Sequence, residues 1–323
     1  MLTAGQTNRN VSVEFVTISD DQAGQRIDNF LATKLKGLPK SRIYRMLRKG
    51  EVRVNKGRIG PAYRLQPGDM VRVPPVRLSA KTDDERSRPS PGALEYLSSR
   101  VIFEDKQLLV LDKPSGMAVH GGSGLSYGVI EALRASRPDC HYLELVHRLD
   151  RETSGCLLIA KRRSYLRSLH VLLRAGSMEK NYMTLVRGDW QLGKVLLEDH
   201  LSTHQRRDGE RHVEVGAEGK ASASRFRPLQ SFSRATLMEV SLLTGRTHQI
   251  RVQAEAAGHP VAGDEKYGDP VFNRQMSRLG LKRMFLHAHA LAFEDPGSGE
   301  WRAYSAPLPE DLREVVDRLE APR

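Results

Sequence analysis

The first part of the chain alternates between two short helical patterns and two short strand patterns. Residues 24 to 36 carry apolar side chains at helical spacing, and a second amphipathic stretch follows Gly-Leu-Pro, with Ser41 as its expected N-cap and Gly50 just past its end. The segments EVRVN and PGDMVRVP then read as strands separated by turn residues. These patterns predict a compact unit of about fifty residues, which is small but viable when tethered to a larger domain.

Strand patterns outnumber helical patterns from residue 101 onward. They occupy residues 101–114, 143–149, 156–161, 180–188, 235–243 and 284–293, whereas helical patterns cover 126–136, 162–176 and 248–258. No regular alternation of strand and helix is present, which argues against a doubly wound fold. The expected class is α/β (α+β), with a mixed, largely antiparallel central sheet.

Residues 78 to 97 mix charged residues with Ser and Pro and show no sustained periodicity. This composition is typical of an exposed linker. The sequence therefore predicts a flexible N-terminal segment (1–23), the small unit (24–77), the linker (78–97) and a larger domain (98–323).

Several classes of protein are excluded by composition. The chain has no run of eighteen apolar residues and begins with a polar segment, so neither a membrane span nor a signal peptide is expected, and the protein should be cytoplasmic. The two cysteines, Cys140 and Cys156, lack C-x-x-C spacing, which argues against a disulfide framework, a zinc ribbon or an iron–sulfur site.

The formal net charge of +12 is concentrated in the small unit. Between Arg26 and Arg77 the sequence contains fourteen Lys and Arg residues but only three Asp and Glu residues. A basic block of this kind favours a phosphate-rich partner, because each neutralised phosphate releases condensed counterions. A membrane surface would also attract the charges, but no amphipathic face rich in Trp or Phe accompanies them.

A polar segment, HRLDRETSG, lies between two apolar runs and places Asp150 between Arg148 and Arg151. Neighbouring arginines favour an ionised carboxylate, which can serve as a nucleophile, a general base or a metal ligand. An ion pair that merely holds a loop explains the pattern equally well. No G-x-S-x-G motif is present, so Ser154 and Gly155 are interpreted as turn formers.

Four further segments carry residues with candidate chemistry. Arg251 follows a polar segment at a predicted helix start, where it can reach a carboxylate, although a surface position is the simpler explanation. Tyr182 lies in a predicted strand and can either pack in the core or stack on a base. Residues 113 to 124 form a glycine-rich loop without phosphate-loop spacing. His287 and His289 can share a strand face, but no third ligand joins them, so no metal site is expected.

Taken together, HRLDRETSG, KNYMTLVRG and GRTHQIRVQAEAAGHP resemble the motifs of the RluA/RsuA-type pseudouridine synthases, in the same order along the chain. Residues 24 to 59 are similar to the S4 RNA-binding domain that many of these enzymes carry. The resemblance implies a pseudouridine synthase fold with an N-terminal S4-like domain. Within the family, the layout is most similar to members that modify several uridines of 23S rRNA.

The resemblance also implies roles for individual residues. Asp150 matches the essential aspartate, which acts at C1′, C2′ or C6 of the target nucleotide. Tyr182 matches the tyrosine that stacks on the target base, with help in removing the C5 proton as a further role. Arg251 matches the arginine that pairs with the aspartate, Ile250 the apolar residue beside it, and Arg148 the arginine that enters the RNA stack. The basic residues expected to bind RNA through the S4-like domain are Arg42, Arg45, Arg48, Lys49, Arg53 and Lys56.

The reaction is an isomerisation, so the resemblance implies no cofactor and no metal. The expected partner is 23S rRNA, free or in an assembling large subunit, and the expected state is a monomer. The same chemistry on tRNA or small-subunit rRNA, and a catalytically silent rRNA-binding protein, are the alternatives. One departure from the family is Gln253, which stands where many relatives have histidine; it puts local packing or an RNA contact in doubt.

Overall fold

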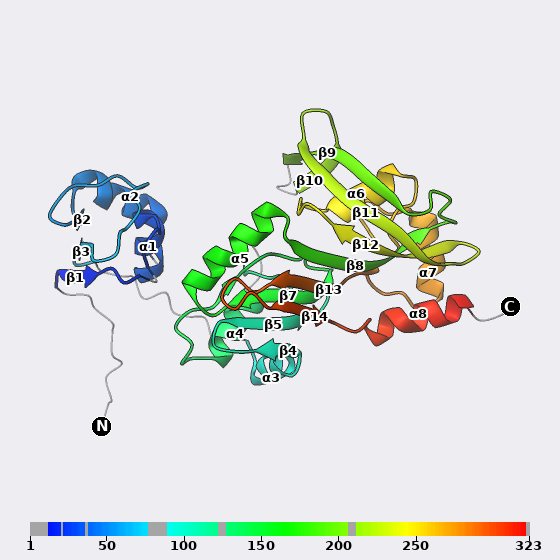
Figure 1. Ribbon diagram of the computed structural model, residues 1–323, viewed down its shortest axis with the longest axis horizontal. Helices are drawn as coiled ribbons and strands as arrows, with labels where there is room; N and C mark the ends of the chain where they lie inside the picture. Colours follow the sequence, from blue (N-terminus) through cyan, green and yellow to red (C-terminus); the bar gives the residue numbers. More distant parts are fainter. Residues whose placement is uncertain are drawn as a thin grey trace, which may run out of the picture. The chain divides into compact units, whose positions relative to one another are not determined.

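The computed structural model describes residues 12–20, 22–35, 38–76, 89–121, 127–205 and 211–320 (Figure 1). The chain divides into two compact units, Met1–Arg88 and Pro89–Arg323. The predictions for residues 1–11 and 77–88, and for part of the glycine-rich loop, fall outside the described residues. No helix in the described ranges is both long and apolar enough to cross a membrane.

The first unit packs two helices against a small antiparallel sheet of strand order β1-β3-β2. Its core contains Ile27, Leu31, Met46 and Val71, all essentially inaccessible to solvent. Gly50 adopts a left-handed conformation (φ 67°) as the C-cap of the second helix, as predicted. The elements are β1 (Glu14–Thr17), α1 (Ile27–Lys34), α2 (Lys40–Lys49), β2 (Arg53–Val54) and β3 (Met70–Val73).

Two sequence-based expectations for this unit are wrong. Residues 14–17 were expected to be flexible but form β1, because their backbone pairs with β3 and the adjacent Ile18 is buried. Helix α2 begins at Lys40 after Pro39, whose φ of −57° suits a helix start, and no side chain caps it, so Ser41 is not the N-cap.

Part of the expected linker belongs to the second unit. Its last residues form helix α3 (Pro91–Ser99), which is capped by Ser90 and buries Leu97. The Ser90 hydroxyl accepts a hydrogen bond from the amide of Ala93 at 3.3 Å, and Pro91 occupies the first helical position. The prediction of an exposed linker is therefore wrong from Ser90 onward.

The second unit is built on one mixed sheet, in which the strand order is β10-β9-β11-β12-β8-β13-β7-β5-β4. Among the described strands, β7 and β13 pair in parallel and all other neighbours are antiparallel, which confirms the predicted sheet type. The strands are β4 (Val101–Glu104), β5 (Leu108–Lys113), β6 (Glu144–Leu145), β7 (Ser154–Ala160), β8 (Met178–Arg187), β9 (Val195–Gln205), β10 (Arg211–Val215), β11 (Lys220–Ser231), β12 (Ala235–Leu242), β13 (Leu286–Glu294) and β14 (Trp301–Ser305).

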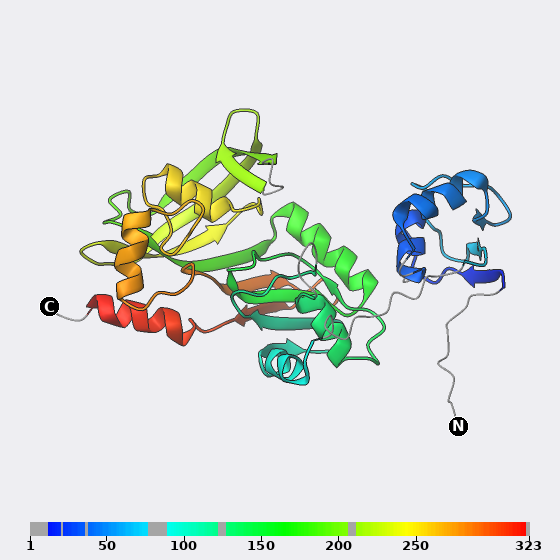
Figure 2. The ribbon, with the colours of Figure 1, turned by 180° about the vertical axis from the view of Figure 1, so that it is seen from behind.

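The long strand β8 joins the two halves of the sheet, pairing with β12 on one side and with β13 on the other. From behind, Figure 2 shows β8 running from the layer of β7 and β13 toward the layer of β9 to β12. Helix α5 packs on β7 and β8, and α6 packs on β9 and β10. The helices other than α3 are α4 (Val129–Ser136), α5 (Arg163–Ala175), α6 (Gln249–Ala256), α7 (Pro270–Arg278) and α8 (Glu310–Glu320).

The Ser154–Gly155 pair does not form a turn, contrary to the sequence-based interpretation. Both residues begin β7, where Ser154 faces His287 of β13 and its hydroxyl lies 2.9 Å from Nδ1 of that ring. Gly155 has φ +108°, and a Cβ there would overlap the main chain of Ala288. The close parallel approach of β7 and β13 therefore requires glycine at this position.

His287 and His289 do not form a metal site with other described residues. Nε2 of His287 and Nδ1 of His289 each lie 3.1 Å from the carbonyl oxygen of Ala306. Across the described ranges, no group of three or more His, Cys, Asp and Glu side chains is arranged to hold a metal ion. The two histidines instead tie β13 to the segment after β14.

We predict that Gly155→Ala destabilises the second unit by about 2 kcal/mol or more, because it combines a left-handed backbone with a main-chain overlap. Gly92→Ala is the matched control, because a Cβ at this exposed position of α3 meets nothing within 4 Å. Its effect should stay within about 1 kcal/mol, in the stabilising direction. Both tryptophans, Trp190 and Trp301, lie in the second unit, so their fluorescence during urea unfolding measures the difference. Equal midpoints for the two variants would contradict the packing argument.

Candidate active site

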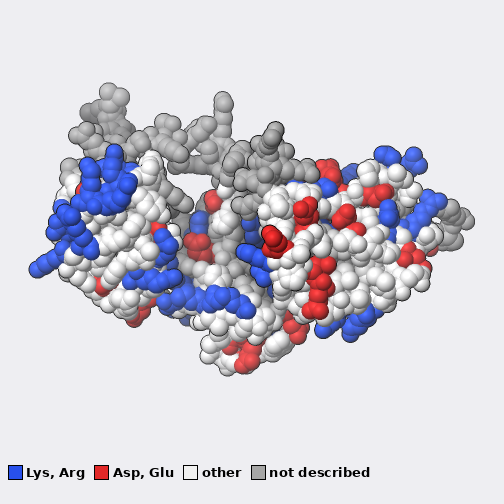
Figure 3. Space-filling model, turned by 90° about the horizontal axis from the view of Figure 1, so that it is seen from above, with Lys and Arg blue, Asp and Glu red and all other residues white. Residues whose placement is uncertain are grey.

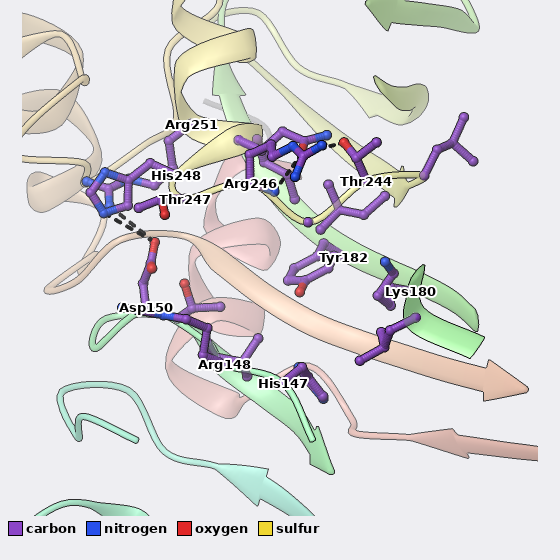
Figure 4. Close-up of a pocket in the computed structure, with 18 of the residues that line it drawn as sticks. His147, Arg148, Asp150, Lys180, Tyr182, Thr244, Arg246, Thr247, His248 and Arg251 are labelled. Atoms are coloured by element: carbon purple, nitrogen blue, oxygen red, sulfur yellow. Dashed lines mark hydrogen bonds and ion pairs between the residues drawn. The ribbon is translucent and has the colours of Figure 1, made fainter. Parts of the chain in front are cut away.

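A cavity of about 860 Å³ opens beside β8. Its walls come from the segment before β7, from β8 itself and from the segment that leads into α6 (Figure 4). The structure brings five residues singled out from the sequence to this one cavity: Arg148, Asp150, Tyr182, Ile250 and Arg251.

The carboxylate of Asp150 is held from the α6 side of the cavity. Its Oδ2 accepts a hydrogen bond from Nη1 of Arg251 at 3.4 Å and lies 3.7 Å from Nε2 of His248, and both contacts are drawn in Figure 4. Neither sequence-adjacent arginine pairs with this carboxylate in the part of the chain that the structure describes. Arg151 instead donates from Nε to the carbonyl of Gly116 at 2.9 Å. The alternative in which Asp150 pairs with a flanking arginine only to hold the loop is therefore wrong.

Arg251 is fixed by a second carboxylate that sequence reasoning missed. Nε and Nη2 of Arg251 donate to the two oxygens of Asp264 at 2.6 and 2.8 Å, and the Asp264 side chain is fully buried. The guanidinium also lies 4.9 Å from the centroid of the Tyr267 ring. This bidentate geometry fixes the plane of the fork and leaves Nη1 directed at Asp150.

The pair keeps its charges despite burial. Burial lowers the pKa of Arg251, but the hydrogen bonds and charge of Asp264 outweigh it and hold that pKa above its ordinary value. Burial likewise raises the pKa of Asp264, and the guanidinium of Arg251 more than reverses this, so the pKa of Asp264 lies below its ordinary value. Arg251 therefore presents a permanent positive charge to Asp150.

His248 approaches Asp150 as a neutral ring. Burial lowers the pKa of His248 to about 4, and its Nδ1 lies 2.9 Å from the hydroxyl of Tyr267. A carboxylate oxygen can only accept, so the ring proton of His248 belongs on Nε2, which faces Asp150. Nδ1 then accepts from the hydroxyl of Tyr267, which itself accepts from the amide of Val213 at 3.0 Å.

The backbone conformation at this point is unusual. His248 has φ 55°, in the left-handed region, immediately before α6. Gln249, which is buried, fixes the turn: its Oε1 accepts from the Thr244 hydroxyl at 2.7 Å and from the Arg246 amide at 2.9 Å. Such strain persists only where surrounding contacts determine it, and here it aims the His248 ring at the cavity. The polar run T-H-Q was the only sequence signal for this arrangement.

Tyr182 and Ile250 form an apolar wall. Both are buried and belong to the same hydrophobic cluster. Burial raises the pKa of the Tyr182 phenol well above its usual range, and the negative charge of Asp150 raises it further. The phenol is therefore neutral over the whole physiological range and presents a flat face with an O–H group.

Positive charge dominates the rest of the cavity lining. Asp150 is the single acid among the lining residues, whereas the lining cations are Arg148, Arg174, Lys180, Arg246 and Arg251. Arg148, Arg174 and Arg246 are exposed. The cavity therefore suits an anionic substrate that meets one carboxylate inside.

The basic residues predicted to bind RNA in the first unit are exposed, with one exception. Figure 3 shows Lys and Arg side chains of this unit gathered with few acidic neighbours. Arg42 is half-buried, and its Nη2 donates to Oε2 of Glu51 at 3.4 Å, so part of its charge is used within the unit. The exposed members of the predicted set are Arg45, Arg48, Lys49, Arg53 and Lys56.

Comparison with known protein families matches residues 107–256 to RNA pseudouridylate synthase and residues 25–71 to the S4 domain. Curated relatives named ribosomal large subunit pseudouridine synthase C include those of Haemophilus influenzae (53% identical, 96% of both chains), Yersinia pestis (56% identical, 96% of this chain and 97% of the relative) and Escherichia coli K12 (54% identical, 95% and 97%). The chain belongs to the RNA pseudouridylate synthase family.

Solved structures agree with this synthase in fold. Human RNA pseudouridylate synthase domain containing 4 covers 71% of this chain and 97% of its own, at a TM-score of 0.59 and 23% identity. The corresponding human domain containing 1 covers 72% and 98%, at a TM-score of 0.55 and 24% identity. The family, the fold class and the S4 domain predicted from the sequence are therefore confirmed.

Gln253, the departure from the family pattern, has a packing role in this synthase. Its Nε2 donates to the carbonyl of Leu197 at 3.1 Å and to Oδ2 of Asp199 at 2.9 Å. The side chain is buried and ties α6 to β9. Gln253 therefore has a structural role. The contact between Arg251 and Asp150 does not involve it.

We predict that Asp264→Asn destabilises the second unit by about 3 to 5 kcal/mol, because it leaves the guanidinium of Arg251 buried without a full counter-charge. Glu239→Gln is the matched control, since Glu239 forms a similar pair with Arg227, whose side chain is 47% exposed. That change should cost no more than about 1 kcal/mol. Urea unfolding followed by tryptophan fluorescence gives both values. A cost at Asp264 as small as that at Glu239 would refute the anchoring role.

Proposed function

We propose that this pseudouridine synthase converts several uridines of 23S rRNA to pseudouridine, acting as a monomer without cofactor or metal. The single observation that carries the proposal is the held carboxylate of Asp150, alone among cations in a cavity with an aromatic wall. The rRNA substrate is supported by the relatives that are 53 to 56% identical and carry a large-subunit name. The S4 domain supports an RNA partner independently.

In this proposal Asp150 is the catalytic carboxylate. The reaction breaks the bond between the uracil N1 and the ribose C1′, turns the base and forms a bond between C5 and C1′, while the proton on C5 is lost and N1 gains one. Asp150 acts on the ribose, at C1′ as nucleophile or at C2′ as base, or adds to C6 of the base. Arg251 orients the carboxylate through its contact with Oδ2.

Tyr182 is proposed to hold the target base. The raised pKa of its phenol makes the phenolate scarce at neutral pH, so proton abstraction by Tyr182 is disfavoured. Its buried ring beside Ile250 instead offers a face on which a uracil can stack. Flipping the target uridine out of a folded RNA costs a few kcal/mol. In this proposal the exposed side chain of Arg148 fills the gap that the flipped base leaves in the stack.

We predict that Asp150→Asn lowers pseudouridine formation by at least about 100-fold, because the amide can neither attack carbon nor accept a proton. Tritium release from rRNA carrying 5-tritiated uridine measures the rate. Asp317→Asn, at an exposed position of α8, is the control and should keep wild-type activity. Retained activity in the Asp150 variant would refute its catalytic assignment.

Two further measurements separate the alternative RNA substrates and the alternative of a catalytically silent protein. A wild-type protein that binds rRNA and forms no pseudouridine would favour a silent RNA-binding protein. Mapping pseudouridines in a strain that lacks the gene distinguishes 23S rRNA from tRNA and small-subunit rRNA. Missing modifications confined to tRNA or to the small subunit would overturn the proposed substrate.

We further predict that the triple change Arg45→Gln, Arg48→Gln and Lys49→Gln weakens rRNA binding and lowers the slope of log affinity against log salt by about 2 to 3, through lost phosphate contacts. The control neutralises three exposed lysines of the second unit, namely Lys106, Lys194 and Lys282. This change should lower the slope less. Filter binding across a salt series gives both slopes. An equal loss in both variants would remove the special role of the first unit.

A further inference from the structure

Lys180 stands in the wall of the active-site cavity. It lies on β8 two residues before Tyr182, and its side chain is half-buried. Figure 4 shows Lys180 and Tyr182 rising from the same strand on the same side. Its ammonium makes no hydrogen bond and no ion pair with any residue that the structure describes. None of the residue roles considered so far uses this cation.

None of the described residues around Lys180 supplies an anion to balance it. In the sheet it is paired with Leu291 of β13, which is buried. The neighbouring His147 accepts a hydrogen bond at Nε2 from the amide of Leu158, and burial, aided by the positive charge of Lys180, lowers the pKa of His147 to about 4, so this ring is neutral. The one acid of the cavity, Asp150, is already held by Arg251.

Such an arrangement is unfavourable in the empty protein. A partly desolvated ammonium without a counter-charge costs free energy, and burial accordingly lowers the pKa of Lys180. The cost is offset when a ligand supplies an anion. The other half-buried cation of the cavity, Arg251, is committed to two carboxylates, so Lys180 is the cation of the inner wall that is available to a substrate.

The spacing along β8 indicates which part of the substrate this cation meets. Residues i and i+2 of a strand face the same side about 7 Å apart. That is also roughly the separation between the base and the phosphate of one nucleotide. A uracil stacked on Tyr182 therefore has a backbone phosphate within reach of a lysine two residues away.

We propose that Lys180 binds a backbone phosphate at the target uridine and thereby fixes the ribose over Asp150. Lys180 is a positioning residue, and the inner wall of the cavity is a phosphate subsite. This inference rests on the proposed function, because it takes the stacked base as its reference point.

Removal of the cation tests the subsite. Lys180→Met should lower kcat/KM for an rRNA fragment about 10- to 100-fold, the range expected for a lost charge-assisted hydrogen bond. Lys180→Arg keeps the charge and should restore most of the loss. Lys194→Met, at an exposed position, is the control and should leave kcat/KM unchanged. The melting temperature of Lys180→Met should not fall, since the substitution removes an unpaired buried charge; a clear fall would indicate a structural role and overturn the proposal.

A chemical change in the RNA identifies the partner directly. A neutral methylphosphonate is placed, one linkage at a time, on either side of the target uridine. In the wild-type enzyme one of these linkages should lower kcat/KM about as much as Lys180→Met does, and in Lys180→Met the same linkage should have no further effect. Additive losses at both linkages would overturn the subsite.

Two other outcomes also decide the question. If Lys180→Arg is as inactive as Lys180→Met although both bind RNA normally, the lysine acts as a proton acceptor and the phosphate assignment is wrong. If the wild-type protein forms no pseudouridine at all, the proposed function fails. The affinity of the intact and methylphosphonate RNAs for wild type and Lys180→Met then still tests the subsite by binding alone.

Discussion

The buried ion pair between Arg251 and Asp264 is the contact on which the active site depends. It joins the first turn of α6 to the segment before α7, and it brings a guanidinium to the loop that carries Asp150. A buried pair of this kind contributes little net stability, because desolvation offsets much of the attraction. Its benefit is geometric: the two parallel hydrogen bonds fix a planar group, and Asp150 is then oriented by a rigid partner.

The side chains around Asp150 deep in the cavity are neutral apart from Arg251, which is paired with Asp264, and Lys180. Burial keeps His147 and His248 uncharged and the phenol of Tyr182 protonated, so each contributes shape and hydrogen bonding rather than net charge. The arginines at the rim remain in contact with solvent. An RNA strand therefore meets the positive charge of the rim first and a drier interior afterwards, where the electrostatic effect of a single carboxylate is strongest.

The sequence predicted the parts of this site that motifs mark and missed the parts that depend on tertiary contact. Asp150, Tyr182 and Arg251 were singled out because three motifs occur in order, and the cavity does bring them together. Asp264 and Tyr267 lie in an irregular segment without periodicity, so no pattern distinguished them from solvated loop residues. Gly155 was misinterpreted because a turn and a tight strand crossing both favour glycine, and only the neighbouring strand tells them apart. The fold class was predictable from strand patterns, whereas β9, β10 and α7 carry too many polar residues for their apolar faces to be visible.

The glutamine at position 253 affects how the joint between α6 and β9 responds to acidity. The joint between α6 and β9 rests on an amide that donates to a carbonyl and to the carboxylate of Asp199. An amide does not titrate, so the Gln253 side of this joint keeps its protons from acidic to alkaline solution. A histidine at the same place would face a carboxylate and gain a proton as the solution became acidic. In this chain the helix that presents Arg251 to the cavity is thus coupled to β9 through a side chain whose own charge does not change with pH.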